Sequence, residues 1–230
     1  PDLRSEHTRH ETLQASIRWS YALASAPEQA LYRRLAVFRG GWSLEAAAAV
    51  CSGDDLGVDY VPPLLSALAA RSLVVAGALG GDRRYRFLFP IRQHAERELA
   101  DAGEAEETAA RHLAYFLALA REAQVGASGP EQTTWLDRLE QDQDNLRAAL
   151  RHGLSDAGDA EAGLRLAAAL WTFWYVRGHW DEGRDYLTRL LAQVDAGRCP
   201  DAVSAGLRAA GLLDWALCDL DAARRSLGES

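Results

Sequence analysis

The chain has 230 residues, of which 48% are hydrophobic, enough for a substantial core, so wholesale disorder is excluded. No apolar run approaches the roughly 20 residues that a membrane-spanning helix needs, and no secretion signal is present, so we expect a cytoplasmic protein without membrane contact. The net charge of −8 lies wholly in the second half: residues 1–103 hold 12 Arg and 12 acids, whereas residues 104–230 hold 13 Arg and 21 acids. A phosphate-binding surface needs the opposite bias, which disfavours nucleic-acid binding by the second half.

The first part of the chain predicts four short helices, at residues 11–24, 28–38, 43–51 and 62–72. Ser25 and Pro27 provide an N-cap and a first-turn proline for the second helix, and Gly40-Gly41 ends it. Ser43 opens the third helix in the same way. We expect the apolar faces around four residues to pack this module: Trp19, Leu35, Phe38 and Phe87.

Residues 73–89 change from helical to alternating periodicity. Leu73-Val74-Val75 is apolar and β-branched, residues 84–89 alternate polar with apolar, and glycines lie between the two segments. This pattern predicts a β-hairpin, the one convincing strand pair in the chain. Pro90 then opens a helix that Gly103 ends. Four helices, a two-stranded hairpin and a closing helix predict a winged-helix-like module over residues 1–103.

The second part, residues 104–230, is expected to be entirely helical, in segments 104–125, 130–153, 159–177, 180–194, 200–217 and 219–228. Laying 171–187 over 211–227 aligns Trp180 with Leu220 and Gly183 with Ala223. Small residues at such positions let two helices touch, which is typical of tetratricopeptide (TPR) hairpins. The sequence therefore predicts a mainly α protein with a TPR-like α-solenoid after the first module, and further repeats beyond residue 230.

Long segments of the chain resemble one family. They are residues 10–51 and 67–75, Tyr85-Arg86-Phe87-Leu88, residues 91–95 and 111–116, Trp135-Leu136, and residues 144–150 and 166–178. These segments are similar to the region behind the motor of STAND-class (NB-ARC-type) ATPases, in the SARP-type and LuxR-type transcriptional regulators of actinobacteria. The resemblance covers nearly the whole chain.

The resemblance implies that the winged-helix module serves as a lid on a nucleotide-binding motor and that the repeats sense a ligand or a partner. No GxxxxGK[ST] motif occurs, and the chain has no lysine, so ATP or ADP would bind to a motor outside this fragment. In related motors a wing triplet contacts the nucleotide through a histidine. The corresponding positions are Phe87, Leu88 and Phe89, and a leucine cannot hydrogen-bond a phosphate. Arg92, in the next helix, remains as a nucleotide-proximal candidate; the alternative is a solvated helix charge.

A cluster of aromatic residues marks the repeats. Trp171, Trp174 and Trp180 fall where the hairpin pattern requires core residues. Tyr175 and its repeat mate Trp215 fall at positions that usually line the concave face of such repeats. Arg165, Thr172 and Arg208 are expected to join them there. Aromatic groups beside arginine are common anchors for a peptide or small ligand, so we expect a protein or small-molecule effector on this face.

Catalysis is not expected, because the six histidines are scattered and no HExxH, GxSxG or phosphate-loop motif occurs. Three widely spaced cysteines form neither a disulfide framework nor a metal motif. DNA reading is also not expected, since the helix before the hairpin offers Arg71 as its one cation, although Arg83, Arg84 and Arg86 of the hairpin could touch phosphate. Two alternatives remain open: a DNA-binding winged helix with a helical effector domain, and a plain TPR docking scaffold.

Overall fold

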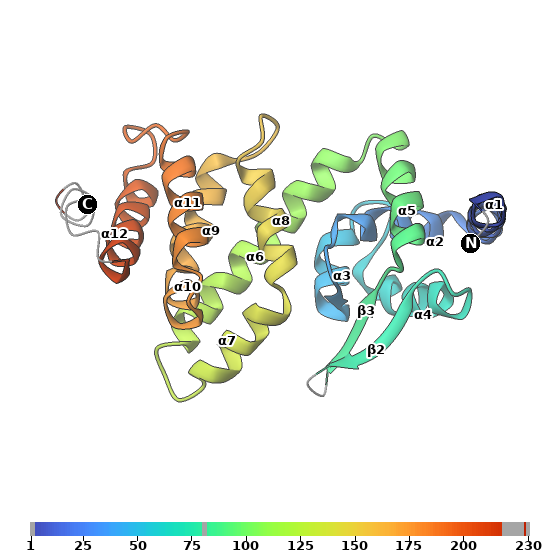
Figure 1. Cartoon of the computed structure of the whole chain (residues 1–230), viewed down its shortest axis with the longest axis horizontal. Helices are drawn as coiled ribbons and strands as arrows, with labels where there is room; N and C mark the ends of the chain where they lie inside the picture. The colour runs from blue at the N-terminus through green and yellow to red at the C-terminus, as the bar shows by residue number, and fades with distance from the viewer. Residues whose placement is uncertain (1–2, 80–81, 218–227, 229–230) are drawn as a thin grey trace. The chain divides into compact units, whose positions relative to one another are not determined.

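The computed structural model describes residues 3–79, 82–217 and 228, with side chains from residue 12 onward outside 79–82. The described part is mainly helical, with a small three-stranded antiparallel sheet (Figure 1). The chain divides into two compact units, residues 1–111 (unit 1) and 112–230 (unit 2). None of the described helices combines the length and the apolar character needed to cross a bilayer.

Unit 1 begins with helices whose starts follow capping chemistry. Its elements are α1 (Leu3–Ala22), α2 (Ala26–Arg34), the 3-10 turn η1 (Leu35–Val37), β1 (Trp42–Ser43), α3 (Leu44–Cys51), the 3-10 turn η2 (Val58–Tyr60), α4 (Val61–Ala70), β2 (Val75–Leu79), β3 (Asp82–Arg86), α5 (Phe89–Asp101) and the first turns of α6 (Ala105–Gly126). Ser25 precedes α2, and its N–H donates to the Glu28 carboxylate at 2.6 Å. Ser43 Oγ accepts the Ala46 N–H at 3.0 Å at the start of α3. Both predicted helix starts are confirmed.

The sheet has β3 in the centre, paired antiparallel with β2 on one side and β1 on the other. The predicted hairpin is confirmed, but its strands are Val75–Leu79 and Asp82–Arg86: Leu73 and Val74 lie buried in the connection from α4, and Phe89 already begins α5. The prediction of a single strand pair was wrong. Strand β1, where Trp42 pairs with Tyr85, has only two residues, too few for an alternating pattern to show.

Aromatic rings form the core of unit 1. The Trp42 ring lies 5.4 Å from Phe38 and 5.1 Å from Phe87, centroid to centroid, and Tyr32 donates its hydroxyl to the Ile91 carbonyl at 3.0 Å. The predicted burial of Leu35, Phe38 and Phe87 is confirmed. The prediction for Trp19 was wrong, because α1 turns Ile17 inward and leaves Trp19 68% exposed.

Unit 2 holds the remainder of α6 and six further described helices: α7 (Gln132–Gln141), α8 (Gln143–Gly153), α9 (Ala160–Ala169), α10 (Trp171–Arg177), α11 (Trp180–Leu191) and α12 (Pro200–Ala216). Two segments predicted as single helices, 130–153 and 159–177, are each split, at Asp142 and at Leu170. Neither break contains glycine or proline, the residues that usually mark the end of a helix, so neither break could be predicted. The predicted helix at 219–228 lies outside the described residues apart from position 228, as do positions 218–227 of the segment 211–227 used in the repeat overlay.

Small residues bring the helices of unit 2 close together. Helix α9 packs against α8, α11 and α12, and α11 packs against α12. A Cβ at Gly183 would lie 2.5 Å from the Trp174 ring, and one at Gly206 would lie 2.7 Å from Leu164. Both separations are shorter than real Cβ contacts: the packing depends on glycine at Gly183, where the Trp174 ring stands in the way, whereas at Gly206 the end of the Leu164 side chain would have to shift.

Candidate functional site

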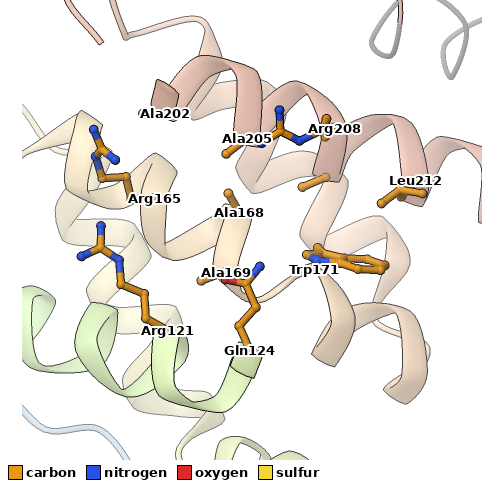
Figure 2. Close-up of a pocket in the computed structure, with 11 residues that line it drawn as sticks. Arg121, Gln124, Arg165, Ala168, Ala169, Trp171, Ala202, Ala205, Arg208 and Leu212 are labelled. Atoms are coloured by element: carbon orange, nitrogen blue, oxygen red, sulfur yellow. The ribbon is translucent and has the colours of Figure 1, made fainter. Parts of the chain in front are cut away.

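An open pocket of about 360 Å³ lies in unit 2, between α6, α9 and α12, with the first residue of α10 at one end (Figure 2). It is lined by Arg121, Gln124, Arg165, Ala168, Ala169, Trp171, Ala202, Ala205, Arg208, Ala209 and Leu212. Ligand sites typically measure about 300–1,000 Å³. The pocket is therefore large enough for a small ligand.

Five of the lining residues are alanines, and they explain why the pocket is open. Alanine favours the helix but extends only a methyl group from it. Ala168 and Ala169 on α9 face Ala202, Ala205 and Ala209 on α12. Longer side chains at these positions would fill the space between the two helices.

The polar lining is cationic. Arg165 is held by Glu161, one turn earlier on α9, through hydrogen bonds of 3.0 Å from Nε and 2.8 Å from Nη2. Arg208 donates to Ser204 Oγ at 2.7 Å, and Arg121 is exposed. Within the described part of the chain neither Arg121 nor Arg208 forms an ion pair, and no lining residue is acidic. The pocket is thus positive in a chain whose net charge is −8.

Two of the three lining arginines lie at the end of the pocket opposite the tryptophan, whereas Arg208 lies on α12 on the tryptophan side (Figure 2). Figure 2 shows the guanidinium groups of Arg121 and Arg165 at one end and the Trp171 ring at the other, with Ala168 and Ala169 between them. Trp171 is half-buried, and its ring lies 6.3 Å from that of Tyr175. This arrangement can bind a molecule that carries a negative group at one end and a flat apolar group at the other.

The five residues predicted for the ligand-binding face do not all meet at the pocket. Arg165 and Arg208 line it, whereas Thr172, Tyr175 and Trp215 do not. Tyr175 is 39% exposed and Trp215 is 56% exposed, so both rings lie on the surface of unit 2.

Sequence reasoning missed the other nine lining residues, among them Arg121, Gln124 and Trp171. Arg121 and Gln124 are three residues apart on α6 and so share a face, which is a usable signal, but nothing in their spacing points to α9 or α12. Trp171 was interpreted as core together with Trp174 and Trp180. Trp174 is buried, as predicted, but the prediction for Trp180 was wrong: it is 36% exposed and its indole N–H donates to the Tyr175 carbonyl at 2.8 Å.

In unit 1 the nucleotide-proximal candidate, Arg92, lies on α5 beside an acid. Its Nε is 3.4 Å from Glu96 Oε1, which also accepts a hydrogen bond of 2.5 Å from Arg39. Leu88 and Phe89, at the start of α5, are exposed. The local charge of Arg92 is therefore partly neutralised by its own helix.

Helix α4 offers little for reading DNA bases. Its flanking cation, Arg71, lies 3.3 Å from the Glu28 carboxylate. On the hairpin, Arg84 donates to the Gly41 carbonyl at 3.1 Å. Two of the arginines weighed for DNA contact thus already serve contacts inside unit 1.

The described residues contain no constellation suited to metal or thiol chemistry. No three His, Cys, Asp or Glu side chains among them group closely enough to hold a metal ion. Cys51 is fully buried, and burial raises the pKa of its thiol to about 12, so it stays protonated at neutral pH.

Comparison with known proteins finds relatives among transcriptional regulators. The chain is 40% identical over 215 residues to "Putative HTH-type transcriptional regulator Rv0890c" of Mycobacterium tuberculosis (strain ATCC 25618 / H37Rv), and equally to "Putative HTH-type transcriptional regulator Mb0914c" of Mycobacterium bovis (strain ATCC BAA-935 / AF2122/97). These alignments cover 94% of this chain but 24% of each relative, so the chain spans about a quarter of their length.

A second relative matches a shorter stretch. "Uncharacterized protein Rv0894" of Mycobacterium tuberculosis (strain ATCC 25618 / H37Rv) is 36% identical over 120 residues, covering 52% of this chain and 30% of the relative. No family model matches the chain, and no solved structure matches it. The similarity to named HTH-type regulators supports a transcription-regulator family for this chain.

Proposed function

We propose that the chain is a non-catalytic regulatory part of a STAND-type ATPase transcriptional regulator. Residues 1–103 act as a winged-helix module on a motor that binds ATP or ADP elsewhere in the parent protein. Residues 104–230 act as TPR-like hairpins that bind an effector, and the parent works in the cytoplasm. The observation that carries the proposal is 40% identity across 94% of the chain to regulators about four times longer than the matched region.

The element order of unit 1 supports a winged-helix role. A helix (α2), a short strand (β1), two helices (α3 and α4) and a β-hairpin follow each other, and β1 closes against β3. Arg71, beside α4, and Arg84, on β3, have partners inside unit 1. These features favour a packing module over a reader of DNA bases.

The helix contacts of unit 2 support a binding role. Helices α9, α11 and α12 meet through glycine and alanine, as hairpin repeats do, and they leave a pocket open on their surface. Proteins built in this way use such surfaces to bind partners or ligands. That role requires no catalytic residues.

The test compares the parent protein with the 230-residue chain. The parent should hydrolyse ATP, the isolated chain should not, and the chain should not retard duplex DNA in a gel at about 50 mM salt, where phosphate contacts are strongest. A parent without ATPase activity would favour a plain docking scaffold. Retardation of DNA that weakens steeply with added salt would favour a DNA-binding winged helix.

A further inference from the structure

We propose that the pocket between α6, α9 and α12 binds a small organic anion. Its carboxylate or phosphate lies against Arg121, with Arg165 and Arg208 adding positive charge at the pocket, and its flat apolar part lies against Trp171. The proposal rests on the proposed function, because it names the class of effector that the repeats take. It identifies the ligand by its chemistry only.

The positive charge of the pocket lining supports an anionic ligand. Arg121, Arg165 and Arg208 come from three helices that are far apart in sequence, so their convergence is a product of the fold rather than of spacing within one helix. Glu161 already pairs with Arg165, whereas Arg121 and Arg208 have no ion-pair partner in the described part of the chain, so these two cations are the ones that a bound anion would neutralise. Hydrogen bonds between a guanidinium and a carboxylate or phosphate are roughly twice as strong as neutral ones, and the planar fork fixes their direction.

The orientation of Arg165 also favours binding of an anion. Glu161 Oε1 accepts hydrogen bonds from both its Nε and its Nη2, which restrains the guanidinium at the pocket wall and leaves its Nη1 for a ligand. Ordering a long side chain before binding removes part of the entropy cost of binding. Arg121, by contrast, has no ion-pair partner in the described part of the chain and can turn toward the ligand.

The apolar end of the pocket, beside Trp171, favours a ligand that carries a flat ring. Trp171 and Leu212 supply an apolar wall, and the alanines of α9 and α12 leave room for a ring beside them. Gln124 adds a neutral hydrogen-bonding group near the floor (Figure 2). A volume of about 360 Å³ fits a compound of one or two rings.

The experiment uses the 230-residue chain and two probes that differ only in charge, 1-naphthaleneacetate and 1-naphthaleneacetamide, with affinities measured by isothermal titration calorimetry. Arg121→Gln with Arg208→Gln removes two cations from the pocket. Arg184→Gln with Arg189→Gln is the matched control. It makes the same change of charge on α11, where both arginines pair with local aspartates at 3.3 and 3.2 Å and neither lines the pocket. Circular dichroism checks that every variant is folded.

We expect the acid to bind at least about tenfold more tightly than the amide, and this advantage to shrink at high salt. The pocket variant should lose at least about tenfold in affinity for the acid, and the control should stay within about twofold. Trp171→Leu should weaken both probes. Equal binding of acid and amide, equal losses in the two double variants, or no binding of either probe would overturn the proposal.

Binding of a short acidic peptide but not of naphthaleneacetate would also overturn it, in favour of a protein partner. These outcomes are independent of ATP hydrolysis by the parent and of DNA retention by the chain. If the pocket does not bind an anion, the proposed regulatory role is unaffected. If the regulatory role is disproved, any measured anion binding by the pocket is unaffected.

Discussion

Glu104→Gln tests the ion-pair network that ties α2 to the α5–α6 connection. Glu104 accepts hydrogen bonds from Arg33 at 2.5 Å and from Arg34 at 2.8 Å. Arg34, whose side chain is 6% exposed, also donates to the Cys51 carbonyl at 3.0 Å and to Asp55 at 2.7 Å. Removing the Glu104 charge leaves a buried guanidinium with less compensation, which is costly.

The lowered pKa of Glu104 gives the size of the expected loss of unfolding free energy. Burial alone would raise this pKa, but the hydrogen bonds and charges of Arg33 and Arg34 outweigh burial and lower it from 4.5 to about 2. A shift of that size corresponds to about 3 kcal/mol. Because the side chain is 20% exposed, solvent screening reduces the expected loss of unfolding free energy to about 2 kcal/mol.

Urea unfolding at pH 7, with hydrogen exchange of peptides from α2 as the local readout, measures this loss of unfolding free energy. The folded pKa lies below the unfolded one, so the stabilisation is present above about pH 4.5 and disappears as the pH falls toward 2. The difference between the wild type and Glu104→Gln should shrink over that range. Glu107→Gln, at a side chain that is 73% exposed, should cost less than about 0.5 kcal/mol. A loss below about 0.5 kcal/mol for Glu104→Gln, or a loss independent of pH, would refute the reasoning.

Three further substitutions test other contacts by thermal or urea unfolding. Gly183→Ala should destabilise unit 2 by about 1–3 kcal/mol, because its Cβ meets Trp174, whereas Gly77→Ala, with open space around it, should be nearly neutral; equal effects would contradict the packing. Burial lowers the pKa of His94, so stability should fall as the pH drops below about 6.5, and His94→Gln should flatten that dependence; an unchanged profile would argue against it. Glu182→Gln removes the negative charge and one of the two oxygens that accept hydrogen bonds of 2.6 and 2.7 Å from Arg147, and it should cost about 1 kcal/mol; no loss would exclude a stabilising pair.

Most of the helices and the β-hairpin could be predicted because helix caps and alternating patterns act on residues that are close together in the chain. A capping serine such as Ser43, or a run of alternating residues such as 84–89, determines structure within a few positions. The breaks at Asp142 and Leu170 were missed because tertiary packing interrupts segments that are helical by composition. Strand β1 was missed because a pairing of two residues depends on β3, about 40 residues later.

The candidate site was predicted only in part for a similar reason. Arg165 and Arg208 were found through the repeat pattern, which identifies exposed positions on paired helices. Arg121 belongs to α6, and its approach to α9 depends on helix packing that leaves no trace in the spacing of charges. Trp171 was assigned to the core because periodicity cannot distinguish a buried ring from one that lines a pocket.

The most direct test of the account measures transcription from a target promoter by the parent regulator. The parent carrying Arg121→Gln and Arg208→Gln is compared with the parent carrying Arg184→Gln and Arg189→Gln. If the pocket regulates the protein, promoter output should differ at least about fivefold between the two, the lower end of typical allosteric coupling, with DNA affinity unchanged. Equal promoter output from the two variants would contradict the account.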